Sequence, residues 1–458
     1  MNVYGSNTVT LTIISFFITL MLILWRPRGL NEAIPAAGGA ILVLISGSVS
    51  LSDLVKIIAT VSDAAITIMA TIVMAITLES FGFFTWAAEG LASRAKGSGI
   101  RLFWYIALFC FLMTMFFNND GSILMATPIL LILLENLGLK NHQKIPYLLT
   151  GVLVATASSA PIGVSNVVNL IALKIVNIDL YKHMEMMFIP AILGLLLLTM
   201  LLFLWFYREL PRKIPPPRKG YQNSFFDPRN HPLKSQLSMT SPAKTRDETY
   251  LMRNIFLFVF LIRIGLFIAS YLQFPIALVA ATGSALLLAW RWIYIKIPPA
   301  DMIKKTPWNI LIFAFCMYVI IYGLHNIGLT HWITVFFQPI VSGNLLNASL
   351  MMGGLLSIMS IFFNNNPALM VGTLTLTNMM LNPLTLKIAY LASVIGSDIG
   401  SLLLPTGTLA SMMWIHILRQ YKLKINWKDY MRVTFIVIPI TVVFTLVCLY
   451  YWVSWFFS

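Results

Sequence analysis

The sequence predicts an all-α polytopic membrane protein made of two inverted repeats, each with a re-entrant hairpin and a broken transmembrane helix. Of its 458 residues, 59% are hydrophobic and 10% are charged, whereas soluble domains carry about 25% charged residues. Apolar runs long enough to cross the hydrocarbon as helices recur, for example at 188–206 and 435–457. Polar clusters interrupt two further apolar runs at matched positions in the two halves of the chain.

The placement of basic residues predicts the orientation. The net charge of +15 gathers between the apolar runs, as cytoplasmic loops of membrane proteins require. We therefore expect no nucleic-acid partner. The first span ends at Arg26 and Arg28, which predicts a multi-pass protein of the plasma (inner) membrane with its N-terminus outside.

Residues 1–207 are expected to form the first membrane repeat. Its hairpin, at about 102–137, has basic residues at both ends and the polar tip 118–122 in the middle. Two full spans would also fit, but the tip has no loop, and irregular backbone at membrane depth is tolerated where it lines a cavity. A helix over about 146–178 should break near Pro161, because proline lacks the helix donor.

Residues 208–250 have the composition of a soluble segment, basic and rich in proline. We expect a cytoplasmic linker with little regular structure. A role in binding lipid headgroups or a partner is the alternative.

Residues 251–458 should form the second, inverted repeat. Its hairpin, at about 346–381, has no positive charge at its flanks and is expected to open to the outside. Its broken helix, at about 386–419, is interrupted between Gly396 and Gly407.

Internal similarity supports the repeat. Phe117-Asn-Asn and Phe363-Asn-Asn lie 246 positions apart, as do Gly82-x-x-x-Trp and Gly328-x-x-x-Trp. Paired discontinuous elements in the two halves are the sequence pointer to the midplane site of a secondary transporter.

The two hairpin tips and the two helix breaks predict one binding site. Half-helix N-termini offer free N–H groups and a positive dipole end, and amide and hydroxyl side chains both donate and accept hydrogen bonds. With no Arg or Lys among them, the predicted residues favour a small, neutral or weakly charged polyhydroxy solute. The predicted substrate-binding residues are Asn118, Asn119, Asp120, Ser122, Ser165, Asn166, Asn169, Asn364, Asn365, Asn366, Thr406 and Thr408.

Asp120 and Asp398 are the predicted proton-coupling residues. A carboxyl inside the membrane is a functional candidate, and burial favours its neutral form, so that it can take up and release a proton. Capping of a half-helix N-terminus is the alternative role. We expect Glu79 and Glu89 to be interfacial, whereas Arg263 lies mid-span with no partner evident from the sequence.

The sequence gives no sign of an enzyme. It contains no phosphate-binding loop, no zinc-binding His motif and no catalytic triad pattern. Its three cysteines stand far apart in apolar runs. We therefore expect no catalytic residues, no metal and no cofactor.

Several motifs together resemble a known family. They are Glu79-Ser-Phe-Gly-Phe-Phe-x-Trp-Ala-Ala88, Asn119-Asp-Gly121, Ser165-Asn-Val-Val-Asn169, Asn364-Asn365 with Pro367, and Ile395-Gly396-x-Asp398-x-Gly400. The chain resembles the arsenite-efflux permeases, the arsenical pump membrane proteins of the ion-transporter superfamily. The resemblance implies a scaffold domain with a mobile transport domain. It also implies export of arsenite or antimonite, driven by protons or by a soluble arsenite-stimulated ATPase. Arsenous acid is a neutral trihydroxide, which agrees with the low charge of the predicted pocket.

Two departures from the family pattern leave alternatives open. The family often has Asp where Thr156 stands, and Pro-Lys where Ser401-Leu402 stands. Both changes remove ionisable groups near the predicted site. A sodium- or proton-coupled carrier for a small organic or inorganic anion is therefore one alternative. A channel-like subunit served by an ATPase docked on 208–250 is another. Membrane lipid is an expected partner, and a homodimer stays open.

Overall fold

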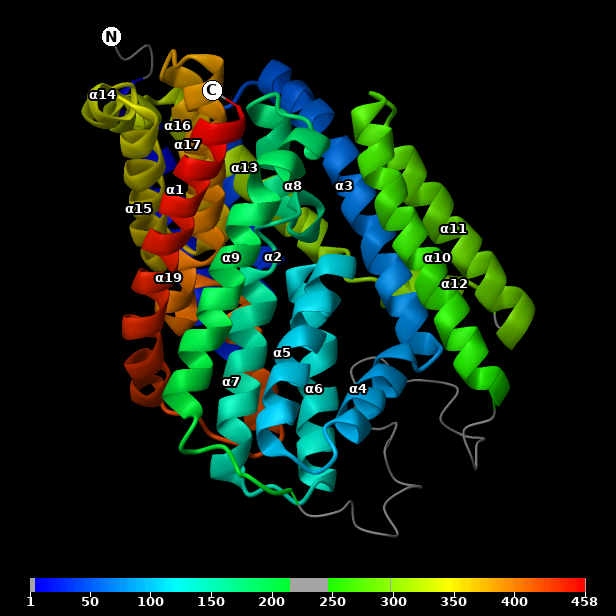
Figure 1. The fold of residues 1–458 in the computed structure, drawn as a ribbon. Coiled ribbons are helices and arrows are strands. Elements are labelled where there is room, and N and C mark those ends of the chain that lie inside the picture. Colours follow the sequence, from blue (N-terminus) through cyan, green and yellow to red (C-terminus); the bar gives the residue numbers. More distant parts are fainter. Residues whose placement is uncertain (1–4, 215–245, 297, 458) are drawn as a thin grey trace.

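The computed structural model describes residues 5–214, 246–296 and 298–457, and every regular element in these ranges is a helix (Figure 1). Ten of these helices are long and apolar enough to cross a membrane. The predicted all-α polytopic class is thus confirmed. The candidate spans are α1 (Ser6–Trp25), α3 (Leu51–Ser80), α5 (Gly99–Phe116), α9 (Leu180–Phe206), α10 (Arg246–Tyr271), α11 (Ile276–Ile295), α13 (Asn309–Asn326), α15 (Leu345–Phe363), α17 (Pro383–Asp398) and α19 (Trp427–Phe456).

Nine further α-helices lie between these spans in the described residues. They are α2 (Ala33–Ile45), α4 (Phe83–Arg94), α6 (Asn119–Asn136), α7 (Asn141–Ala157), α8 (Val167–Ile175), α12 (Ala300–Lys305), α14 (Leu329–Val341), α16 (Asn365–Asn378) and α18 (Leu409–Gln420). Helices from distant parts of the sequence pack together: α11 lies against α3, α19 against α9, and α13 against α2. Figure 1 shows α3, α10 and α11 along one side of the molecule and α15 and α19 along the other.

The outer faces of the long helices are apolar. Ile45, Ile293 and Trp455 are 72%, 78% and 87% exposed. Exposed apolar surface of this extent is unfavourable in water and marks a membrane contact. The exposed side chains therefore support a lipid-facing surface around the helices.

An asparagine joins the two helices of each predicted hairpin. Helix α5 ends at Phe116, and Asn118 then caps α6 by accepting a hydrogen bond from the Gly121 N–H at 3.1 Å. Helix α15 ends at Phe363, and Asn364 adopts φ +72°, a left-handed value that asparagine tolerates better than most residues. These junctions lie at the predicted tips. Their depth in the membrane and the inverted relation of the two halves stay predictions.

Both predicted broken helices are interrupted. Helix α7 ends at Ala157 and α8 begins at Val167, with one short 3₁₀ turn between them. Helix α7 begins at Asn141 rather than near residue 146, because the Gln143 side chain accepts a hydrogen bond from the Lys140 N–H at 3.0 Å and caps the helix earlier.

The second interruption, between α17 and α18, contains two 3₁₀ turns. Gly407 is required there, since a Cβ at this position would lie 1.9 Å from the Ser401 carbonyl oxygen. The irregular backbone between the half-helices is thus tightly packed.

Two sequence predictions need comment. Glu79 lies in the last turn of α3, which continues to Ser80, and is 1% exposed inside the helix bundle. Its position at the membrane interface stays a prediction. The interruption comes at Gly82, whose φ of +78° separates α3 from α4. Residues 215–245, most of the predicted linker, lie outside the described residues.

Candidate functional site

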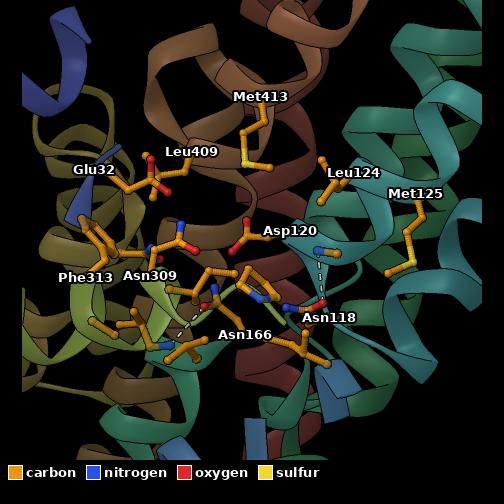
Figure 2. Close-up of a pocket in the computed structure, with 18 of the residues that line it drawn as sticks. Glu32, Asn118, Asp120, Leu124, Met125, Asn166, Asn309, Phe313, Leu409 and Met413 are labelled. Atoms are coloured by element: carbon orange, nitrogen blue, oxygen red, sulfur yellow. Dashed lines mark hydrogen bonds between the residues drawn. The ribbon is translucent and has the colours of Figure 1, made fainter. Parts of the chain in front are cut away.

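A cavity of about 200 Å³ lies where the two junctions and the two helix interruptions meet. The first junction contributes Asn118 and Asp120, and the second contributes Asn366. Asn166, the N-cap of α8, and Leu409, the first residue of α18, come from the two interruptions. Figure 2 shows Asn118, Asp120 and Asn166 around one space. The fold thus brings all four predicted elements to a single cavity.

The opposite wall comes from connections that sequence reasoning missed. Glu32 follows α1, while Lys305 and Asn309 flank the connection from α12 to α13. Figure 2 places Glu32, Asn309 and Phe313 across the cavity from Asn118 and Leu124. These residues lie at the edges of apolar runs, without the three consecutive amide or carboxyl residues that marked the tips. Their only sequence signal was a charge or amide beside a span.

The charge of the cavity differs from the expectation. Glu32 forms an ion pair with Arg26 and is 6% exposed. Lys305 lines the wall, although no Lys or Arg was expected there. Three ionisable residues, Glu32, Asp120 and Lys305, therefore line one partly enclosed space.

Asp398 lies behind the cavity and is completely buried. Its carboxylate accepts hydrogen bonds from Ser159 Oγ at 2.7 Å, Asn166 Nδ2 at 3.1 Å and Asn169 Nδ2 at 2.8 Å. Donors to an ionised carboxyl stabilise the charged form. Asp398, the last residue of α17, therefore joins the first helix interruption to the second one.

Asn166 joins the carboxylate to the cavity. Its Oδ1 accepts a hydrogen bond from the Val168 N–H at 3.1 Å, while its Nδ2 donates to Asp398. The cap fixes which end of the amide faces the carboxylate. The side chain cannot flip without losing both hydrogen bonds.

The alternative capping role of the two acids is wrong. Asn118 is the N-cap of α6, and Asp120 lies in the first turn beyond it. Thr408 is the N-cap of α18, whereas Asp398 is the last residue of α17. The negative charge of Asp120 is favourable at a helix N-terminus, but Asp398 has no such position in its own helix.

The remaining predicted residues surround the cavity without lining it. Asn364 Nδ2 donates to the Thr406 carbonyl at 3.3 Å, which joins the second tip to the second interruption. Thr408 Oγ1 accepts from the Ser411 N–H at 2.9 Å. Asn119, Ser122, Ser165, Asn169, Asn365 and Thr408 are buried by other side chains.

Four polar atoms of the predicted site residues are buried with no hydrogen-bond partner among the described residues: the Oγ atoms of Ser122 and Ser165, the Nδ2 of Asn118 and the Oδ1 of Asn169. Of the four, only the Asn118 amide belongs to a cavity-lining residue. An unsatisfied buried donor costs about 1–3 kcal/mol, so this amide is ready to bind a solute.

Both departures from the family pattern lie behind the cavity wall. Thr156 is buried, and its Oγ1 donates to the Val152 carbonyl at 3.0 Å. Ser401 and Leu402 are buried as well. None of the three is among the lining residues.

Comparison with known proteins identifies the family. The profile of the family described as arsenical pump membrane protein matches residues 11–220 and 221–453. A Bacillus subtilis (strain 168) protein, named provisionally as an arsenical pump membrane protein, is 57% identical over 444 residues, covering 97% of this chain and 100% of that protein. The arsenical pump membrane protein of Escherichia coli is 29% identical over 429 residues, covering 94% of this chain and 95% of its own length.

A solved structure supports the fold. The Alcanivorax borkumensis YdaH transporter, described as having an unusual topology, matches with a TM-score of 0.57 at 11% identity, covering 88% of each chain. This likeness concerns the fold alone. The full-length profile match and the 57% identity show that the chain belongs to the arsenical pump membrane protein family of membrane transporters.

Proposed function

We propose that the protein exports arsenite or antimonite, as the neutral trihydroxide, across the plasma membrane in exchange for protons. The observation that carries this proposal is the single cavity lined by Asn118, Asp120, Asn166 and Asn366. The N-terminus would lie outside and residues 208–250 in the cytoplasm. A soluble ATPase and a homodimer are not required for this reaction.

The lining suits a small neutral polyhydroxide. Each hydroxyl of such a solute donates one hydrogen bond and accepts others, and asparagine amides do both. Asn118, Asn166, Asn309 and Asn366 line the space, and Figure 2 shows Asn309 across it from Asn118. The three cysteines lie on α5, α13 and α19 and do not line the cavity. We therefore expect the metalloid to be held through hydroxyl groups rather than through arsenic–sulfur bonds.

Asp120 is the better placed of the two acids to carry the proton. It lines the cavity and is only partly buried, so protons can reach it. Asp398 is held by three hydrogen-bond donors and has no exposed surface. In our proposal Asp120 releases its proton on one side and regains it on the other, and Asp398 holds Asn166 and Asn169 in place. Asp398 stays the second candidate for proton coupling.

Transport in everted membrane vesicles tests this function. Vesicles that contain the protein and have an acidic interior should accumulate arsenite without added ATP, and nigericin should abolish the uptake. Vesicles that lack the protein serve as the control. No uptake under an imposed pH gradient would refute proton-driven export, and uptake that requires sodium would favour the alternative carrier.

The presence of Lys305 favours one alternative, a carrier for a small anion. A lysine in the cavity wall can bind a carboxylate or oxyanion, whereas a neutral solute needs no cation.

Lys305→Met separates the two functions. For a neutral trihydroxide we expect the KM of transport to change less than about threefold, since loss of a charge-assisted hydrogen bond would raise it roughly 10-fold or more. The matched control is Lys304→Met, because Lys304 is an exposed neighbour that does not line the cavity. A large rise in KM with Lys305→Met alone would show that the transported species is an anion.

A further inference from the structure

Arg263 is a buried cation inside a membrane span. It lies in α10, is 4% exposed, and belongs to the apolar segment Thr249–Tyr271. Placing a guanidinium group there is costly unless its donors are satisfied. Arg263 forms no salt bridge to any carboxylate among the described residues.

Its hydrogen bonds go to the end of another helix. Arg263 Nε donates to the Phe116 carbonyl at 2.6 Å, and Nη2 donates to the Phe117 carbonyl. These carbonyls belong to the C-terminus of α5, where the last turn of a helix has no intrahelical donors. A positive charge is also favourable at this end of the helix dipole. One side chain of α10 therefore caps α5 directly before Asn118.

Aromatic contacts reinforce the same attachment. The Phe116 ring packs against Phe256 at 5.1 Å and Phe260 at 5.9 Å between centroids, both edge-to-face. Phe256, Phe260 and Arg263 follow one another at intervals of four and three residues, and so they share one face of α10. This face holds the end of α5 by ring contacts and by two hydrogen bonds.

The second junction has the ring contact but lacks the arginine. Phe363, at the end of α15, packs against Phe16 of α1 at 5.7 Å. The residue 246 positions before Arg263 is Phe17, which is 55% exposed. Of the two junctions, the one capped by arginine is also the one that carries Asp120 rather than Asn366.

A role in stability alone explains Arg263 poorly. Its Nη1 is buried with no hydrogen-bond partner among the described residues. Replacing a buried ionic group by a packed apolar side chain is often neutral or stabilising, and α1 shows that an apolar helix can support such a junction. The arginine is costly to bury, and its hydrogen bonds in the described part of the chain go to the backbone that directly precedes the cavity residues.

We propose that Arg263 is a positioning residue, which fixes the α5–α6 junction and thereby holds Asn118 and Asp120 toward the cavity. Its two donors constrain the Phe116 and Phe117 carbonyls, and the backbone enters α6 from that point. Without them, the junction keeps its ring contacts but loses its fixed orientation.

Hydrogen exchange on the full-length protein in detergent tests this proposal without any substrate. In Arg263→Met, the backbone amides of residues 113–125 should exchange at least about tenfold faster, which corresponds to the loss of a charge-assisted hydrogen bond. Residues 359–371 at the second junction should be unchanged and serve as the internal control. Arg253→Met is the matched variant, because Arg253 is an exposed residue of the same helix.

Exchange at residues 113–125 that is no faster in Arg263→Met than in the wild type would overturn the proposal. If backbone amides exchange faster throughout the protein in Arg263→Met, Arg263→Lys is the variant that tests the positioning role. This variant keeps the charge but cannot bind both carbonyls in the same forked geometry. In Arg263→Lys, exchange that becomes faster at residues 113–125 alone would support the positioning role. An equal increase at residues 113–125 and 359–371, or no increase at either, would refute it.

The transport readout rests on the proposed function. Arg263→Met should raise the KM for arsenite several-fold with a smaller effect on the maximal rate. The KM of Arg263→Lys should lie between those of Arg263→Met and the wild type. If arsenite is not the substrate, only this readout fails, and the exchange result is unaffected. A proportional loss of maximal rate with unchanged KM would count against positioning.

Discussion

Asp120→Asn should abolish proton-driven export. Asparagine has nearly the same shape as aspartate and can form similar hydrogen bonds, but it cannot take up or release a proton. We expect uptake driven by a pH gradient to fall by about two orders of magnitude, which is the scale on which a positioned proton-transfer group acts. The measurement is arsenite uptake into everted vesicles with an acidic interior. Asn366 occupies the matched position of the second junction, so the substitution makes the two junctions alike.

Two controls show whether the effect belongs to coupling. Substrate exchange at equal pH on both sides needs no net proton movement and should persist in Asp120→Asn. Asp429→Asn, an exposed acid in the first turn of α19, should leave both activities near the wild-type level. Normal gradient-driven uptake by Asp120→Asn would remove this residue from the coupling role.

Asp398→Asn should abolish substrate binding and also destabilise the protein. Whichever carboxylate oxygen becomes an amide group, a donor then faces Asn166 or the pair Ser159 and Asn169. Asn166 cannot turn its amide around, because its Oδ1 caps α8. Leaving a buried donor without an acceptor costs about 1–3 kcal/mol. We expect a clearly lower melting temperature in detergent and no measurable arsenite transport.

Measurements of melting temperature and of transport on the same variants distinguish the role of Asp398 from that of Asp120. Asp120→Asn should change the melting temperature little, since the Asp120 carboxylate accepts no hydrogen bond from another side chain in the described structure. Asp398→Asn should lose substrate exchange as well as gradient-driven uptake. If Asp398→Asn melts like the wild type and retains exchange, the carboxylate does not organise the site.

The sequence was most informative where polar residues stood inside apolar runs. Asn118 and Asn364 each interrupt an apolar run with a group that is costly to bury, and in the structure each ends one helix and caps the next. Chemistry of this kind is local, because a cap needs only the neighbouring N–H groups. The helix interruptions predicted at residues 158–166 and 396–407 were equally readable from their proline and glycine residues, although α17 continues to Asp398.

Residues that act through distant partners could not be found this way. Arg263 is separated by more than a hundred positions from Phe116, whose carbonyl it binds. Glu32 and Lys305 reach the cavity from connections that carry no polar cluster. Their roles depend on how helices pack, which local pattern does not record.

The sequence by itself determined the membrane class, the spans, the two polar junctions and the two interrupted helices, because hydrophobicity, capping and backbone chemistry act over a few neighbouring residues. Only the tertiary structure decided which polar groups face the cavity. It placed Asp120 on the wall and Asp398 behind it under three donors, and it brought Lys305 to a site expected to have no cation. The physical reason is that burial and hydrogen-bond partners of a side chain are set by helices far away in the sequence.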